Sequence, residues 1–111
     1  MTPVLNRRLV LEQALRQADG AGGARLNWVP RGTHWAQIIP GTGRETAGEA
    51  VTLSSVTYRI IVRASAVGAP SRPKPEQRFR DGSRIYKIAA VTEADPRGHY
   101  LLCVATEETV A

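Results

Sequence analysis

The chain has 111 residues, of which 42% are apolar and 5% aromatic, and its formal net charge is +5. This length suits one domain, over residues 1–111, and the apolar share excludes a disordered polymer. No stretch approaches the ~18 consecutive apolar residues of a membrane-spanning helix, and the first residues lack the apolar region of a signal peptide. We therefore expect a protein that is made in the cytoplasm and does not contact membranes.

The first patterned segment, residues 5–17, fits two kinds of secondary structure. Leu9, Leu11 and Leu15 recur with the period of two that is typical of a strand, but Leu11 and Leu15 are also spaced as on one face of a helix. Propensity alone favours a helix, because Leu, Arg, Glu, Gln and Ala dominate the segment. The glycine-rich residues 18–23 predict a turn or a flexible loop.

Residues 26–39 predict a bent strand that contains both tryptophans, Trp28 and Trp35. Pro30 and Gly32 interrupt it and are expected at a bulge or a sheet edge. Residues 40–50 contain three glycines and charges of both signs without any period, so they predict the longest loop.

The clearest strand is expected at residues 51–66, where apolar and polar side chains alternate from Val56 to Arg63. Three prolines make residues 67–77 a second long loop. The dipeptide Asp81-Gly82 is a strong hairpin signal between a short strand at residues 78–80 and a longer one at residues 84–92.

The last strand is expected at residues 100–106, after a turn at residues 95–98. It is apolar on both faces, so either both faces are buried or one of them meets another subunit. The pattern as a whole predicts an all-β fold of five or six strands, a small antiparallel barrel or sandwich with two long loops.

No combination of residues predicts catalysis, a metal site or a cofactor. Cys103, the only cysteine, lies in an apolar run and is expected to be a small buried hydrophobe. The two histidines, His34 and His99, are 65 positions apart, and the glycine clusters do not continue into a phosphate-binding motif. We therefore expect a protein that is not an enzyme.

A group of basic residues interleaved with aromatic residues supports a different hypothesis, an OB-like nucleic-acid-binding module whose rings stack on bases. The same aromatic residues, at alternating strand positions, are also what a core requires. The residues concerned are Arg59, Arg63, Arg78, Arg80, Arg84 and Lys87, with Tyr58, Phe79 and Tyr86.

Charge is distributed unevenly along the chain. Residues 59–87 carry eight Lys or Arg against two acids, whereas residues 88–111 carry one Arg against four acids. A basic middle and an acidic end are suited to nucleic acid or to head-to-tail contacts between subunits, although a solvated Arg-rich surface has the same composition.

Several segments, in this order and spacing, resemble the phage head–tail joining family, also described as head completion or stopper proteins. The Pro-rich residues 69–76 depart from that pattern. The Arg- and Ala-rich composition suits a prophage or a gene transfer agent. The segments that carry the resemblance are Asn6 to Leu9, Asp19 to Gly23, Trp28, Trp35-Ala36, Glu45, Ile60 to Arg63, Arg78-Phe79, Asp81 to Ile88 and Asp95 to Leu101.

The resemblance implies a β-barrel in which residues 6–17 are a strand, and a structural role in the neck of a particle. Family members assemble as a ring, commonly a hexamer, beneath the portal and its adaptor ring protein. They form the docking surface for the tail terminator or tail tube protein. We expect such a protein to be made in the bacterial cytoplasm and then built into the virion or phage-like particle.

In some members the loop after the second strand projects into the channel and retains the packaged double-stranded DNA. That loop corresponds here to residues 40–50. Its charges are either channel-facing groups or merely solvated. The candidate gate residues are Gly41, Thr42, Gly43, Arg44, Glu45, Thr46, Gly48 and Glu49.

Six residues are candidates for a subunit interface. Trp28 and Trp35 are either anchors of the core or barrel rim or interface hot spots. Arg59 and Arg63 share one strand face, and they either pair with Glu107 and Glu108 of a neighbour or are solvated. The two glutamates are adjacent in the chain and therefore point to opposite faces of their strand.

Overall fold

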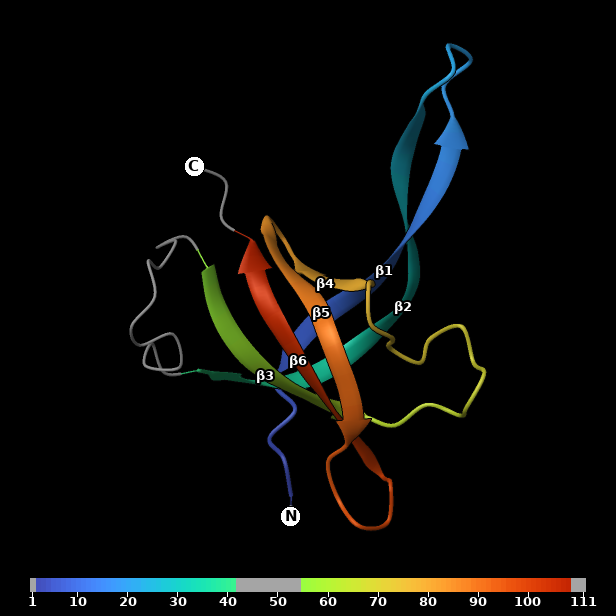
Figure 1. The fold of residues 1–111 in the computed structure, drawn as a ribbon. Helices are drawn as coiled ribbons and strands as arrows, with labels where there is room; N and C mark the ends of the chain where they lie inside the picture. The colour runs from blue at the N-terminus through green and yellow to red at the C-terminus, as the bar shows by residue number, and fades with distance from the viewer. Residues whose placement is uncertain (1, 42–54, 109–111) are drawn as a thin grey trace.

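The computed structural model describes residues 2–41 and 55–108. Six strands form one antiparallel sheet that closes into a barrel in the order β1-β2-β3-β6-β5-β4, which confirms the expected all-β barrel (Figure 1). No helix occurs in the described ranges, and hence none that is long and apolar enough to cross a membrane. The strands are β1 (Arg7–Ala18), β2 (Ala24–Pro40), β3 (Ser55–Arg63), β4 (Arg78–Asp81), β5 (Arg84–Glu93) and β6 (Tyr100–Glu108).

β1 is a strand despite its helical propensity, as the family resemblance implied. It pairs with β2 over its full length and with β4 at Val10 to Glu12. Leu9 and Leu11 alternate into the core and are completely buried. Non-local pairing on both edges, together with this burial, outweighs the modest difference in local propensity.

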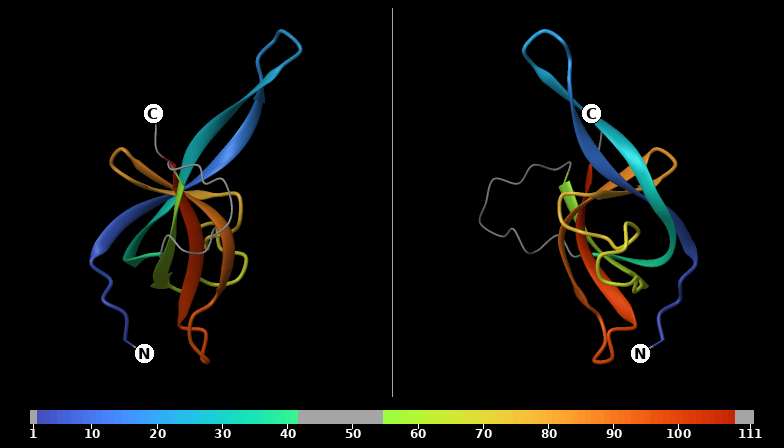
Figure 2. Two further views of the ribbon diagram at one scale, coloured as in Figure 1. Left: turned by 60° about the vertical axis from the view of Figure 1, so that its left-hand side comes forward. Right: turned by 90° about the vertical axis from the view of Figure 1, so that its right-hand side faces the viewer.

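A bulge in β2 confirms the expected break near Pro30 and Gly32. Leu11 pairs with Gly32 and Glu12 pairs with Pro30, so Arg31 is the extra residue on the β2 side. Beyond this bulge β1 and β2 leave the barrel as a two-stranded ribbon, which is plain in Figures 1 and 2. We call residues 13–29 the arm.

The tip of the arm is held by one side chain. Asp19 Oδ1 accepts hydrogen bonds from the backbone N–H groups of Ala21 and Gly23, at 2.8 and 3.0 Å. The residues from Leu15 to Asn27 are all exposed. The Cα radius of gyration is 15.3 Å, compared with about 13 Å for a compact domain of this length.

The turns of the C-terminal half agree with the sequence. Asp81 pairs with Arg84 across a two-residue loop, in which Gly82 has φ 61° at the first central position. The Gly98 N–H donates to the carbonyl of Asp95 at 3.1 Å and closes the expected turn between β5 and β6. β3 ends at Arg63, earlier than expected, because residues 64–77 already form the second long connection.

Side chains alternate between the inside and the outside of the barrel along each strand, and the inward-facing side chains form the core. In β6 the inward residues Leu101, Cys103 and Ala105 are buried, whereas the outward residues Leu102 and Val104 are half-buried. The fully enclosed core residues are Leu9, Leu11, Ala36, Ile60, Val62, Phe79, Tyr86, Ile88, Leu101, Cys103 and Ala105.

Candidate interaction surfaces

A cluster of charged and aromatic side chains lies where the arm leaves the barrel. Arg78 and Arg80, on β4, donate to the two carboxylate oxygens of Glu12 at 2.7 and 2.8 Å. The guanidinium carbon of Arg78 lies 4.0 Å from the centroid of the Trp28 ring. The Glu12 side chain is only 5% exposed. Burial tends to raise its pKa, but the hydrogen bonds and charges of the two arginines lower it on balance.

The sequence did not single out Glu12. Its local context, Leu11-Glu12-Gln13, contains no feature that identifies a buried acid. Its partners lie 66 and 68 positions away on β4. Trp28, a candidate interface residue, is half-buried at the base of the arm, where Arg78 covers its ring.

A second ion-pair cluster lies at the barrel end that contains the β4–β5 hairpin. Arg84 donates from Nε to Glu107 Oε2 at 2.7 Å and from Nη2 to Oε1 at 3.0 Å. The Tyr58 hydroxyl donates to Glu107 Oε1 at 2.9 Å. Hydrogen bonding to Arg84 lowers the pKa of Glu107 against the opposing effect of burial.

This cluster corrects the expectation that Glu107 is a solvated residue that could pair with Arg59 or Arg63 of a neighbour. Its side chain is 13% exposed and is bound by Arg84 of its own chain. Glu108 is exposed, so the two glutamates do point to opposite faces.

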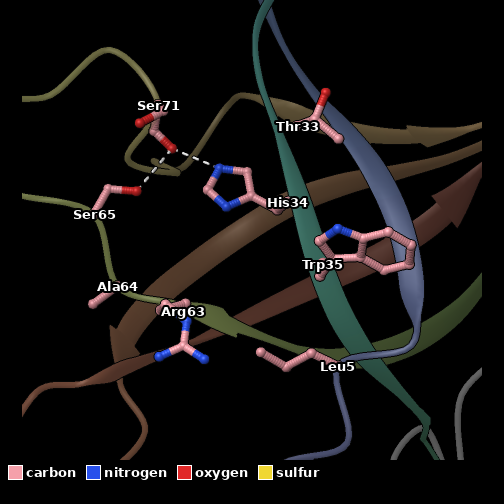
Figure 3. Close-up of a pocket in the computed structure, with 8 residues that line it drawn as sticks. All are labelled: Leu5, Thr33, His34, Trp35, Arg63, Ala64, Ser65 and Ser71. Carbon is pink, nitrogen blue, oxygen red and sulfur yellow. Dashed lines mark hydrogen bonds between the residues drawn. The ribbon is translucent and has the colours of Figure 1, made fainter.

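Trp35 is exposed on the outer face of the barrel, which contradicts a place in the core. The residue is 57% exposed and lines an open cavity of about 470 Å³, together with Leu5 and Arg63 (Figure 3). His34 also lines this cavity, where its Nε2 donates to the Ser71 carbonyl at 2.7 Å, and burial lowers its pKa.

The outer face of β3 and β6 is partly apolar and is flanked by arginines. Arg59 and Arg63 are both exposed on it, as expected from the alternation. Ile61 lies between them and is 5% exposed, and the Arg63 guanidinium carbon lies 5.7 Å from the Tyr100 ring centroid. Arginine and aromatic side chains are enriched in protein–protein contacts.

Most of the candidate gate loop falls outside the described residues. Gly41 alone is described. Its N–H donates to the Thr57 carbonyl at 2.7 Å, and a Cβ there would lie 2.5 Å from the same oxygen, so only glycine fits. Thr42, Gly43, Arg44, Glu45, Thr46, Gly48 and Glu49 lie outside the described residues.

The side chains proposed for base stacking are not available for it. Phe79 and Tyr86 are completely buried, and Tyr58 packs edge-on against Tyr86 with ring centroids 5.2 Å apart. Arg78, Arg80 and Arg84 bind acids of their own chain. The aromatic residues therefore form the core, and the OB-like stacking hypothesis loses its basis.

Cys103 is a buried hydrophobe, as expected. It is 0% exposed, and burial raises its pKa to about 12, so the thiol stays protonated. Among the residues that the structure describes, no group of three or more His, Cys, Asp or Glu could hold a metal ion.

These observations define a class of protein: a small β-barrel whose candidate sites are outer surfaces and a projecting arm. The family model described as phage head completion protein matches residues 1–108, and the chain belongs to that family. A protein in the structure titled "Virion of native gene transfer agent (GTA) particle" is 60% identical, with a TM-score of 0.82, over 99% of this chain and 100% of its own. The chain is thus a structural protein of the head–tail connector.

A more distant structure shows the same fold. A protein from Shigella flexneri 2a, solved in solution, is 19% identical with a TM-score of 0.64, over 93% of this chain and 92% of its own. The comparison with curated proteins found no significant match.

Proposed function

We propose that this protein assembles as a ring, commonly a hexamer in its family, beneath the portal-adaptor ring protein. There it closes the DNA-filled head and forms the docking surface for the tail terminator or tail tube protein. The observation that carries this proposal is the family match over residues 1–108, together with 60% identity to a protein of a gene transfer agent particle.

The surfaces of the barrel support this function. Trp35, Arg59 and Arg63 are exposed on the outer strands. Side chains of these types supply most of the binding energy in protein–protein contacts. We infer that this face contacts a neck protein, with Glu108 at its edge as the remaining candidate acid.

The loop between β2 and β3 is proposed as the DNA gate. It connects Pro40 to Ser55, at the barrel end that also contains the β4–β5 hairpin. The Arg-rich composition suits a surface close to DNA phosphates. We further propose that the whole chain is one domain, made in the bacterial cytoplasm before it joins the particle, and that it catalyses no reaction.

Electron microscopy of particles from a strain that lacks this gene tests the proposal. We expect DNA-depleted heads without tails beside free tails, and complementation with the intact gene should restore tailed, filled particles. Normal tailed and filled particles in the deletion strain would contradict the connector role.

A further inference from the structure

The arm has two strand edges that pair with no other described residue. β1 from Gln13 to Ala18 pairs only with β2, and β2 from Ala24 to Val29 pairs only with β1. Both outer edges therefore carry unpaired N–H and C=O groups. Edges of this kind are templates for pairing with another chain.

The side chains of the arm are also uncovered. Leu26 is 57% exposed and Leu15 is 40% exposed, on opposite faces of the ribbon. A two-stranded ribbon with no third strand or packed layer is marginally stable in water. At its base, however, Trp28, Arg78 and Glu12 anchor the arm to the barrel. The arm is thus oriented by the barrel, and yet no described residue outside the arm pairs with it along its length.

The charge of the arm restricts its partner. Arg16 and Arg25 are exposed and have no ion pair with any described residue, and Asp19 binds the backbone of the tip. The arm therefore suits an acidic surface.

The chain itself has such a surface along β5. β4 pairs with β5 only as far as Lys87, and Ile88 exchanges backbone hydrogen bonds with Glu76 and Gln77. From Ala89 to Glu93 no described residue pairs with this edge of β5. Glu76 and Glu93 are exposed beside it and have no ion pair in the described part of the chain.

We propose that the β2 edge of the arm of one copy, which carries Arg25, docks on the β5 edge of a second copy near Glu93, so that the positive arm lies against the acidic edge. The arm and the end of β5 lie at opposite ends of the molecule (Figure 1). When such a contact is repeated in one direction from copy to copy it is heterologous, and it gives a ring when its rotation closes. The inference rests on the proposed ring-forming connector role and names the contact that would build the ring.

Charge reversal in full-length protein tests the contact, with each variant complementing the deletion strain. Arg16→Glu with Arg25→Glu reverses the arm, and Glu76→Arg with Glu93→Arg reverses the edge. Each reversal should lower the amount of this chain in purified particles by at least about tenfold, and the combined variant should restore it. Arg8→Glu is the control, because it reverses a charge at an exposed position of β1 outside the contact.

A cross-link identifies the partner directly. Arg25→Cys combined with Glu93→Cys, treated in intact particles with a short bis-maleimide, should give multimers of this chain, and neither single variant should give them. The native Cys103 is buried and protonated, so it does not compete. Circular dichroism of each variant establishes that it folds.

The outcomes separate the inference from the connector function. If the control and both reversals restore tailed particles equally, or the combined variant fails to recover, the arm contact is wrong and the connector role stands. Cross-links from the arm to a different protein also overturn the self-contact. If the strain without the gene makes normal particles, the connector role itself fails.

Discussion

The guanidinium of Arg78 stacks on the indole of Trp28, with the guanidinium carbon 4.0 Å from the ring centroid, and Arg78 Nε donates to Glu12 at 2.7 Å. These contacts join β4 to the base of the arm. The direction in which the arm leaves the barrel therefore depends on three side chains from three strands.

Glu12→Gln tests the carboxylate at this junction. The substitution leaves Arg78 and Arg80 without their anionic partner in a nearly buried site, so we expect a loss of about 1–3 kcal/mol in the free energy of unfolding. Urea denaturation at pH 7 measures it. Glu108→Gln, at an exposed glutamate, is the matched control and should change stability by less than about 0.5 kcal/mol.

Trp28→Ala tests whether the junction orients the arm. The stacking contact is worth about 1–2 kcal/mol in a partly desolvated site, so amide hydrogen exchange in Ala14–Ala18 should be roughly tenfold faster. The barrel strands β3 and β6 should exchange as before. Trp35→Ala removes an exposed ring away from the arm and should leave the rate of amide hydrogen exchange in the arm unchanged. If both variants raise that rate equally, the stacking does not hold the arm.

Stability should fall as the pH is lowered, because acids in the fold have lowered pKa values. The pKa values of Glu12 and Glu107 lie below their ordinary value of 4.5 in the folded protein. Their contribution is present above the unfolded pKa and is lost as the pH falls through the folded pKa. The pKa of His34 is also lowered from 6.5 in the folded protein. As the pH falls below about 6.5, the unfolded state takes up the proton first, so His34 lowers the stability of the folded state too, at higher pH than the glutamates do.

Urea denaturation from pH 7 to pH 3 checks this dependence. Glu107→Gln should flatten the decrease below about pH 4.5, because the glutamine does not titrate. A variant that loses stability as steeply as the native protein over that range would contradict the assigned role of Glu107.

Tyr86→Phe should be neutral or stabilising. The Tyr86 hydroxyl is buried and finds no hydrogen-bond partner among the described residues. Removing it eliminates an unsatisfied polar group while keeping the ring packed against Tyr58. We expect thermal unfolding to occur at the same temperature or higher. Tyr58→Phe is the contrast, because it removes a hydrogen bond to Glu107 and should therefore destabilise the protein. A clear loss of stability in Tyr86→Phe would reveal an undetected partner of the hydroxyl.

Replacing residues 40–50 with a short Gly-Ser turn tests the proposed DNA gate. The barrel should remain intact, because among the described residues of this range only Pro40 and Gly41 pair with β3, at the very end of β2. Particles built with the shortened chain should lose DNA, measured as the ratio of filled to empty heads. Particles that retain DNA normally would contradict the gate.

Local chemistry was sufficient to predict several parts of this protein from its sequence. The alternation around Val56 to Arg63, the glycine of the β4–β5 hairpin and the turn at Asp95 to Gly98 depend on residues close in the chain. Cys103 was expected in the core because its neighbours are apolar. The family resemblance, carried by the order of many weak motifs, correctly implied a strand at the N-terminus and the connector role.

Tertiary structure decided the rest, because strand pairing brings together residues that are far apart in the chain. Whether residues 7–18 formed a helix or a strand depended on partners in β2 and β4. Glu107 could be placed only once β6 lay beside β5 and thus near Arg84. The arm likewise exists because β4 covers only Val10 to Glu12 of β1, so the chain beyond that point has no third strand to pair with.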